Sequence, residues 1–125
     1  MATKKEKGIG DNLKRGTIEI VLLSMLEIED QYGYQLSQTL ATLSEGKYRL
    51  NEATMYPTLY RLEKRGYLEA YKKTVVGNRF RVYYHLTESG VEYLNIVRDQ
   101  YLLFCDMMET FLNNLSLKKE VEISS

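Results

Sequence analysis

Two segments decide the fold of this 125-residue chain: NEATMYPTLYRLEKRG at residues 51–66 and RFRVYYHL at residues 79–86. The first segment begins with Asn51, a favourable helix N-cap, and ends with Gly66, a residue typical of helix ends. Apolar residues between them recur in steps of three and four, which predicts a helix. The buried face of this helix is predicted to be Tyr56, Leu59 and Leu62.

After Gly66 the apolar period changes to two, which predicts β-strands. One face of the second segment would carry Phe80, Val82, Tyr84 and Leu86, and the other Arg79, Arg81, Tyr83 and His85. Residues 67–75 are also rich in Tyr and Val, and Val76-Gly77-Asn78 supplies the turn of a hairpin. Thr87 would then cap a further helix.

The segments on either side of the hairpin and its preceding helix are predicted to be helical. Residues 12–28 hold an unusually broad apolar stripe, which suggests that more than one partner surface covers it. After a polar break at residues 29–31, a second helix begins at Tyr32-Gly33-Tyr34 and ends near Gly46. A last helix is expected from Glu88 to about Leu117, with a heptad seam. The seam consists of Leu94, Val97, Tyr101, Phe104, Met108, Phe111 and Leu115.

Three short helices, a two-stranded β-hairpin and a long helix form a mainly α fold, a winged helix-turn-helix with a C-terminal dimerisation helix. We therefore expect a flexible leader at residues 1–11, a DNA-binding domain at 12–86, a dimerisation helix at 87–117 and a flexible tail at 118–125. In such a motif the third helix enters the DNA major groove, and the hairpin wing lies along the backbone or in a neighbouring groove.

The charge distribution agrees with this motif, although the formal net charge is zero. Nine cations and three carboxylates between residues 47 and 85 give this segment a charge of +6. The segments 17–46 and 86–117 carry −5 and −4. A basic segment suits a polyanion partner but equally a solvated surface, so charge alone leaves both open. Its position on the third helix and wing favours nucleic acid.

Several motifs, in order, resemble the PadR-like transcriptional regulators. They are LKRGT at residues 13–17, YGYQL at 32–36, TMYPTLYRLEKRG at 54–66 and RVYYHLTESG at 81–90. The resemblance implies a homodimeric regulator, usually a repressor, which binds a roughly palindromic double-stranded DNA operator. It also implies that the C-terminal helix forms the dimer with the partner's C-terminal and first helices. The hairpin of family members often has a basic residue at the positions of Val82 and His85, so the resemblance implies weaker DNA binding by this hairpin.

The candidate DNA-binding residues lie on the third helix, the wing and the start of the second helix. They are Tyr34, Asn51, Thr54, Met55, Tyr56, Thr58, Arg61, Lys64, Lys72, Lys73, Arg79 and Arg81. Arg61 could read guanine, grip phosphate or pair within the domain, and phosphate contacts are the more numerous kind. Tyr56 and Tyr34 combine core packing with a hydroxyl that can reach phosphate, and core packing is the expected main role of Tyr34.

The predicted dimer interface is Leu22, Met25, Leu94, Val97, Tyr101, Phe104, Met108, Phe111 and Leu115. Around its centre, Phe104, Met107, Met108 and Phe111 could line a site for a small-molecule effector, because methionines adapt to ligands. An ordinary packed interface is the competing interpretation. The alternative function, a small-molecule-sensing module, rests on this cluster. The tryptophan-lined effector mode of some family members does not apply, because the chain has no tryptophan.

An enzyme finds no support, since no glycine-rich phosphate loop, acid pair or nucleophile–base pair is evident. We expect no cofactor and no metal site. Cys105 rules out an intrachain disulfide, since it is the only cysteine, and suits a small interface residue. His85, the only histidine, is expected to face outward from the wing. Neither a membrane span nor a secretory signal is evident, so the default location is cytoplasmic.

Overall fold

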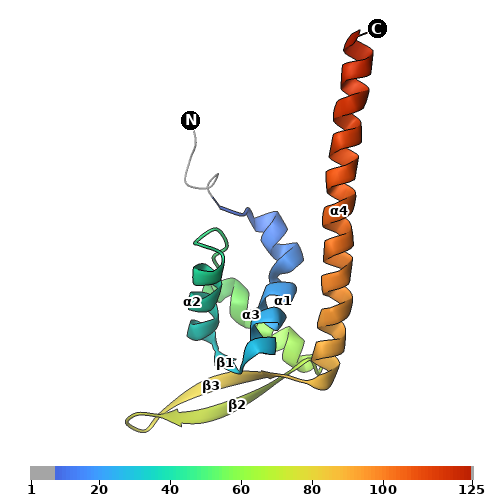
Figure 1. Ribbon diagram of the computed structural model, residues 1–125. Coiled ribbons are helices and arrows are strands. Elements are labelled where there is room, and N and C mark those ends of the chain that lie inside the picture. Colours follow the sequence, from blue (N-terminus) through green and yellow to red (C-terminus); the bar gives the residue numbers. More distant parts are fainter. Residues whose placement is uncertain (1–7, 125) are drawn as a thin grey trace. The chain divides into compact units, whose positions relative to one another are not determined.

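The computed structural model describes residues 8–124 and contains the predicted winged helix-turn-helix with a long last helix (Figure 1). The elements, in chain order, are α1 (Asp11–Ile28), β1 (Gln31–Tyr32), α2 (Gly33–Leu43), α3 (Glu52–Lys64), β2 (Leu68–Val75), β3 (Arg79–Leu86) and α4 (Glu88–Ser124). The chain forms two compact units, one ending at Leu94 and one beginning at Asn95. The boundary between them therefore lies inside α4.

The sheet has three antiparallel strands in the order β1-β3-β2, one more than the hairpin that the sequence predicts. Strands β2 and β3 pair from Leu68 with Leu86 out to Val75 with Arg79. Strand β1 is only two residues long and pairs with β3 through Gln31 and Tyr32. The predicted break at residues 29–31 does separate α1 from α2, but Gln31 also belongs to β1. This side chain is buried, donates to the carbonyl oxygen of Met25 and accepts from the Thr39 hydroxyl.

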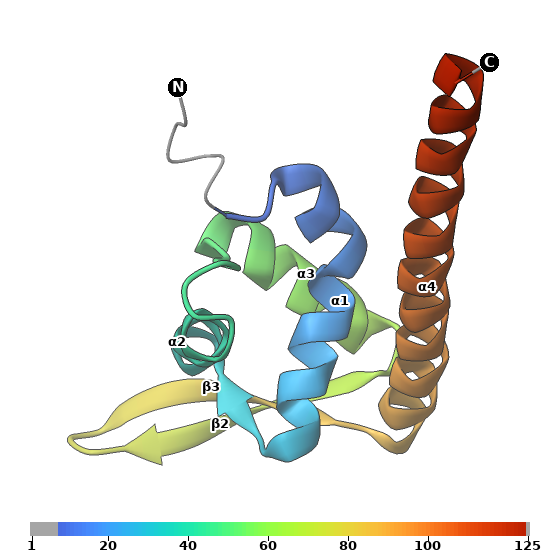
Figure 2. The ribbon, with the colours of Figure 1, turned by 45° about the horizontal axis from the view of Figure 1, so that its top comes forward.

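Helices α1, α2 and α3 all lie on one side of the sheet, and the far end of the hairpin extends beyond them (Figures 1 and 2). This arrangement explains the burial along β3. Tyr84 and Leu86, on the predicted apolar face, are buried, whereas Phe80 and Val82 on the same face are exposed because no helix covers that part. The hairpin turn has the residues its backbone requires, with positive φ at Gly77 and Asn78.

The core belongs to the first unit and contains side chains from all three short helices, the sheet and the start of α4. Its fully buried members include Leu22, Leu23, Leu36, Met55, Leu59, Leu62, Leu68 and Leu94. The broad apolar stripe of α1 is thus covered largely within its own chain, by contacts with α2, α3 and β3.

Local signals at helix ends confirm several boundaries. The side chain of Asn51 caps α3 by accepting from the backbone N–H of Thr54 at 2.9 Å. Gly66, with φ at +83°, follows the last turn of α3. Thr87 caps α4 through a bond from the Gly90 N–H to its hydroxyl at 3.0 Å. Gly46 also has positive φ, but α2 already ends at Leu43.

The predictions for the two ends of the chain concern a leader at residues 1–11 and a tail at residues 118–125. Residues 1–7 of the predicted leader lie outside the described residues, and α1 begins at Asp11. The N–H of Ile9 donates to the carbonyl oxygen of Lys47 at 3.0 Å. The expectation of a flexible tail from residue 118 was wrong, because α4 continues to Ser124. Within residues 8–124, no helix combines the length and the apolar character that a membrane span needs.

Candidate nucleic-acid interface

Helix α3 presents a polar and aromatic face to solvent. Met55, Thr58, Leu59 and Leu62 form its buried face, while Thr54, Tyr56, Tyr60, Arg61 and Lys64 are exposed. The prediction of DNA contacts from Met55 and Thr58 was therefore wrong, since only 0% and 1% of these residues is exposed. The buried face is rotated from the predicted one, with Met55 and Thr58 inside and Tyr56 outside.

Thr58 is buried without an unsatisfied hydroxyl. Its Oγ1 donates to the carbonyl oxygen of Thr54 at 3.0 Å and accepts from Nη2 of Arg61 at 3.1 Å. The Thr58 hydroxyl thereby holds one nitrogen of the exposed Arg61 guanidinium close to the helix. Arg61 keeps further donors of its five N–H groups for an external acceptor.

The start of α2 packs against α3 through Tyr56. A Cβ on Gly33 would lie 2.2 Å from the Tyr56 hydroxyl, so any other residue at this position would displace the Tyr56 ring. Burial, and then the charge of Glu52, raise the pKa of Tyr56, so this hydroxyl stays protonated and able to donate. Tyr34 is 59% exposed. The expectation that Tyr34 mainly packs in the core was wrong, and its ring is available on the surface.

A ladder of three tyrosines crosses the outer face of the sheet, opposite the helices. Tyr83 of β3 pairs with Tyr32 of β1 and with Tyr71 of β2, with ring centroids 5.4 and 5.7 Å apart. Two wing cations lie against these rings. The Arg81 guanidinium is 4.3 Å from the Tyr32 ring centre, and Nζ of Lys73 is 5.1 Å from that of Tyr83. Cation–π contacts of this kind hold a charge in place while leaving it accessible.

Asp30 joins the base of the hairpin to the segment after α1. Its carboxylate accepts from the Tyr71 hydroxyl at 2.7 Å and lies 2.8 Å from Nδ1 of His85. Burial would raise the pKa of Asp30, but the bonds from His85 and Tyr71 and the nearby charges of His85 and Lys73 outweigh it and lower this pKa. His85 is exposed on the outer face, as predicted.

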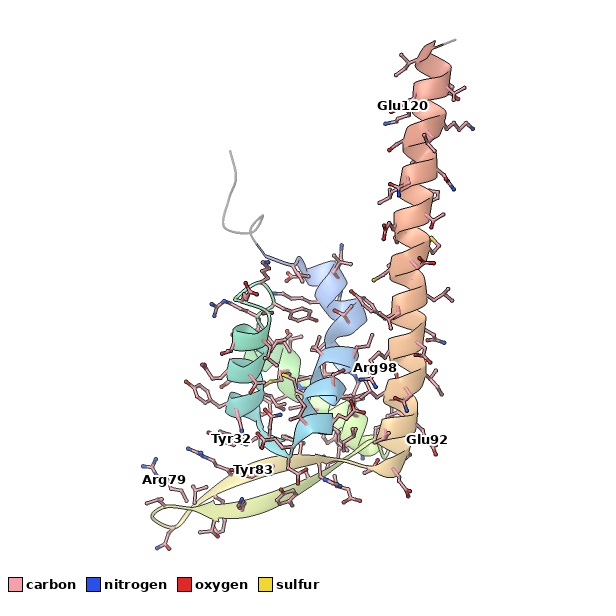
Figure 3. The ribbon with its side chains drawn as sticks, viewed as in Figure 1. Tyr32, Arg79, Tyr83, Glu92, Arg98 and Glu120 are labelled. Carbon is pink, nitrogen blue, oxygen red and sulfur yellow. The ribbon has the colours of Figure 1, made fainter. Side chains whose placement is uncertain are left out.

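The predicted DNA-binding cations share one property: none has a carboxylate within ion-pair distance among residues 8–124. These six cations are Arg61 and Lys64 on α3 and Lys72, Lys73, Arg79 and Arg81 on the hairpin. All six are exposed, and Figure 3 shows Arg79 near the hairpin turn. By contrast, Arg65 pairs with Glu19 at 3.8 Å and lies 5.0 Å from the ring centres of both Tyr67 and Tyr93. Internal neighbours therefore neutralise Arg65, whereas the other six cations have no carboxylate at ion-pair distance among residues 8–124.

The predicted dimer residues divide between the two units. Leu22, Met25 and Leu94 are buried in the core of the first unit, so their assignment to a dimer interface was wrong. On the outer part of α4, Val97 and Met108 are half-buried, whereas Tyr101, Phe104, Phe111 and Leu115 are exposed. Met107 and Cys105 are exposed as well. The effector site at Phe104, Met107, Met108 and Phe111 stays a prediction.

Sequence reasoning missed three residues that arrange the wing: Asp30, Tyr32 and Tyr83. Tyr83 carried a usable signal, because it alternates with Arg81 on the strand face opposite Tyr84. Tyr32 carried none, because its segment predicted the start of a helix and β1 has only two residues. Asp30 carried none, since only the fold brings it to His85, 55 residues later in the chain. Residues 8–124 contain no cluster of three His, Cys, Asp or Glu side chains arranged like metal ligands.

The fold and this surface define a winged helix-turn-helix protein with a long C-terminal helix. Residues 22–96 match the Transcriptional regulator PadR-like family, and the chain belongs to that family. It is a family of transcriptional regulators and not of enzymes.

Solved structures agree with this assignment. A transcriptional regulator from Clostridium thermocellum is 29% identical, with a TM-score of 0.75 over 81% of this chain and 98% of the other. A PadR family transcriptional regulator from Eggerthella lenta is 34% identical, with a TM-score of 0.72 over 81% of this chain and 86% of the other. A Lysinibacillus sphaericus protein named "Uncharacterized protein X" is 28% identical over 86% of this chain and 98% of its own length.

Proposed function

We propose that this PadR-like regulator is a homodimeric repressor that binds a palindromic DNA operator through α3 and the β2–β3 hairpin. The observation that carries the proposal is the set of six exposed cations on these two elements, none of them paired with a carboxylate among residues 8–124. Unpaired surface cations raise the energy of the free protein and are neutralised by a polyanion, with release of counterions from the DNA.

The two elements would have different tasks. Thr54, Tyr56 and Arg61 lie on the exposed face of α3, where side chains can reach base edges in the major groove. The hairpin cations would contact phosphates, which supplies affinity and orientation but little sequence information. Tyr32 and Tyr83 would act through Arg81 and Lys73 by holding these cations against their rings.

The second copy would associate through the outer part of α4. This segment exposes a run of large apolar side chains, namely Tyr101, Leu102, Leu103, Phe104, Met107, Phe111, Leu112, Leu115 and Leu117. So much apolar surface on one helix is unusual for a monomer and is what a helix-to-helix interface would cover. A symmetric dimer would place two α3 helices in major-groove segments about one helical turn, or roughly 34 Å, apart.

The test is selection of duplexes by the full-length protein from a randomised pool, followed by sequencing. We expect a palindromic motif with half-sites about 10 base pairs apart. Placing that motif between a promoter and a reporter gene should lower expression when the protein is present. Recovery of no enriched motif would refute specific binding, and raised expression would refute the repressor role.

A further inference from the structure

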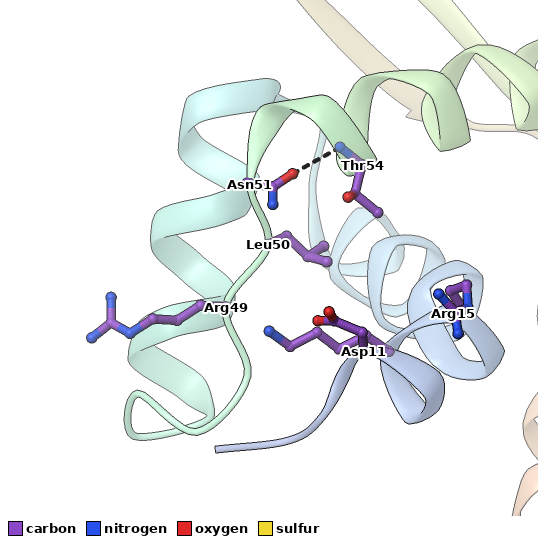
Figure 4. Close-up of a pocket in the computed structure, with 7 residues that line it drawn as sticks. Asp11, Arg15, Arg49, Leu50, Asn51 and Thr54 are labelled. Carbon is purple, nitrogen blue, oxygen red and sulfur yellow. Dashed lines mark hydrogen bonds between the residues drawn. The ribbon is translucent and has the colours of Figure 1, made fainter. Parts of the chain in front are cut away.

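A surface pocket of about 240 Å³ lies where the start of α1 meets the start of α3 (Figure 4). Its lining comes from the first turns of α1, the segment before α3 and the first turn of α3. The lining residues are Asp11, Lys14, Arg15, Arg49, Leu50, Asn51 and Thr54. None of Lys14, Arg15 and Arg49 was among the residues that the sequence marked for DNA binding.

The pocket is positively charged. Lys14, Arg15 and Arg49 bring three cations to it, and Asp11 brings one carboxylate. None of these four groups forms an ion pair among residues 8–124, so the pocket keeps an excess of positive charge. The neighbours of two cations are neutral, since Nζ of Lys14 lies 6.0 Å from the Tyr48 ring centre and Arg15 donates to Oδ1 of Asn12.

Arg15 and Arg49 lie at the rim of the pocket, whereas Lys14 is half-buried. Arg15 and Arg49 are exposed, and Figure 4 shows the Arg49 side chain extending outward from the chain segment that lines the pocket. The floor includes the half-buried Leu50. A site for a small free anion would be expected to enclose its cations, whereas charges on an open rim suit an anion presented by a large partner.

The pocket also adjoins the part of α3 that the proposed function places against DNA. Thr54 lines the pocket and is an exposed residue of α3. Asn51 accepts from the Thr54 N–H, which fixes the first turn of α3 beside the rim. DNA that meets the exposed face of α3 at Thr54 would therefore carry its backbone past Lys14 and Arg49.

We infer that this pocket binds a backbone phosphate of the DNA, as an anchor formed by α1 and the segment before α3. The inference rests on the proposed function and adds a phosphate contact separate from the hairpin. It assigns Lys14 and Arg49 as phosphate-binding residues and Asp11 as a residue that weakens the contact.

The test compares full-length variants on the duplex obtained by selection, over a range of salt concentrations. Lys14→Gln with Arg49→Gln removes two pocket cations, and Lys118→Gln with Lys119→Gln removes two exposed cations of α4 as a control matched in charge. Each lost phosphate contact flattens the slope of log K, where K is the DNA association constant, against log salt by about 0.9. Relative to 1 M salt, this lowers the affinity at 0.1 M salt by about eightfold. We expect this loss, per bound protomer, for the pocket variant and less than about twofold weakening for the control. Asp11→Asn removes the one carboxylate of the pocket and should therefore strengthen DNA binding, the opposite of the effect expected for the pocket variant.

Equal affinities and slopes for the pocket variant and the control would overturn the inference. It would also be overturned if inorganic phosphate, titrated into labelled protein and followed by NMR, bound at Lys14 and Arg49 while the pocket variant kept full DNA affinity. Both outcomes are distinct from failure of the proposed function. In that case the wild-type protein would select no duplex, or replacement of Lys72, Lys73, Arg79 and Arg81 with Gln would leave the affinity unchanged.

Discussion

Residues 8–94 and residues 95–124 expose surfaces of opposite character. The first unit buries most of its leucines and leaves cations and several tyrosines outside, with Tyr34, Tyr60, Arg61 and Arg81 among them. The second unit is a single helical segment whose exposed residues include nine large apolar side chains between Tyr101 and Leu117. The first unit therefore completes its own core and exposes charge, whereas the second leaves an apolar surface uncovered, which the proposed dimer would bury.

The contrast extends to how the exposed groups are held. In the first unit, Arg81 and Lys73 lie against aromatic rings, and Thr58 accepts from Arg61, so the surface is ordered before any partner arrives. Ordering in advance lowers the entropic cost of binding. Phe104 and Phe111 are 50% and 52% exposed, and among residues 8–124 neither ring has an aromatic or cation–π contact.

The largest expected effect comes from the hairpin. Replacing Lys72, Lys73, Arg79 and Arg81 with Gln removes up to four phosphate contacts per protomer, so affinity for the selected duplex should fall by about 1,000-fold or more at 0.1 M salt. The slope of log K against log salt should flatten by up to about 3.6. Oligomeric mass, measured by light scattering, should stay that of wild type. A change in mass would show that the hairpin cations also affect association, and would contradict the assignment of separate surfaces to DNA binding and to association.

The next effect concerns α4. Phe104→Glu with Phe111→Glu places charge within the apolar surface and should raise the dimer dissociation constant about 100-fold or more. Sedimentation at several concentrations would measure it. Asn113→Glu with Asn114→Glu adds the same charge at exposed polar positions of the same helix and serves as control. Similar dissociation of both variants would mean that charge alone, and not apolar contact, governs association.

A smaller effect tests how tightly the first unit is packed. A Cβ at Gly90 would lie 2.2 Å from the carbonyl oxygen of Tyr67, which is backbone and cannot move aside easily. Gly90→Ala should lower the free energy of unfolding by about 2 kcal/mol, as overpacking does. Gly16→Ala is the control, because an added Cβ at this exposed position of α1 has open space around it. Alanine also favours the helical conformation over glycine. Urea unfolding that ranks the two variants equally would contradict the packing described.

The smallest effect is pH-dependent and concerns Asp30. Its pKa is lowered below the ordinary 3.8 in the folded protein, so the carboxylate stabilises the fold above that pH, and the stabilisation is lost as pH falls through the folded pKa. Asp30→Asn should cost about 0.5 kcal/mol at neutral pH, a small value because the side chain is 35% exposed. The difference from wild type should vanish under acidic conditions in urea unfolding. A difference that persists when the pH lies below the folded pKa of Asp30 would contradict this account.

The sequence predicted the helix order, the hairpin and its turn, because apolar period and the residues Asn51, Gly66, Gly77 and Thr87 act locally. Two aspects could not be predicted. Strand β1 is too short to show a period. The predicted buried face of α3 was wrong because Thr58 is a polar residue and was placed on the exposed face. In the fold it is buried, and its hydroxyl bonds to Thr54 and Arg61.

The candidate site followed a similar division. Exposed cations were found from charge and strand alternation, and six of them lie on the elements expected. The apolar repeat of α4 could not separate Leu94, which closes the core of its own chain, from Phe104 and Phe111, which stay outside. Both groups obey the same spacing, and only the tertiary packing of the first unit distinguishes them.

The central claim is that DNA binds the polar surface of the first unit and not the apolar surface of α4. Hydrogen exchange of the full-length protein, with and without the selected duplex, tests it most directly. Added protection should appear in α3 and in the hairpin segments around Lys73 and Arg81, and residues 101–117 should be unchanged. Protection confined to residues 101–117, with α3 and the hairpin unaffected, would contradict the account.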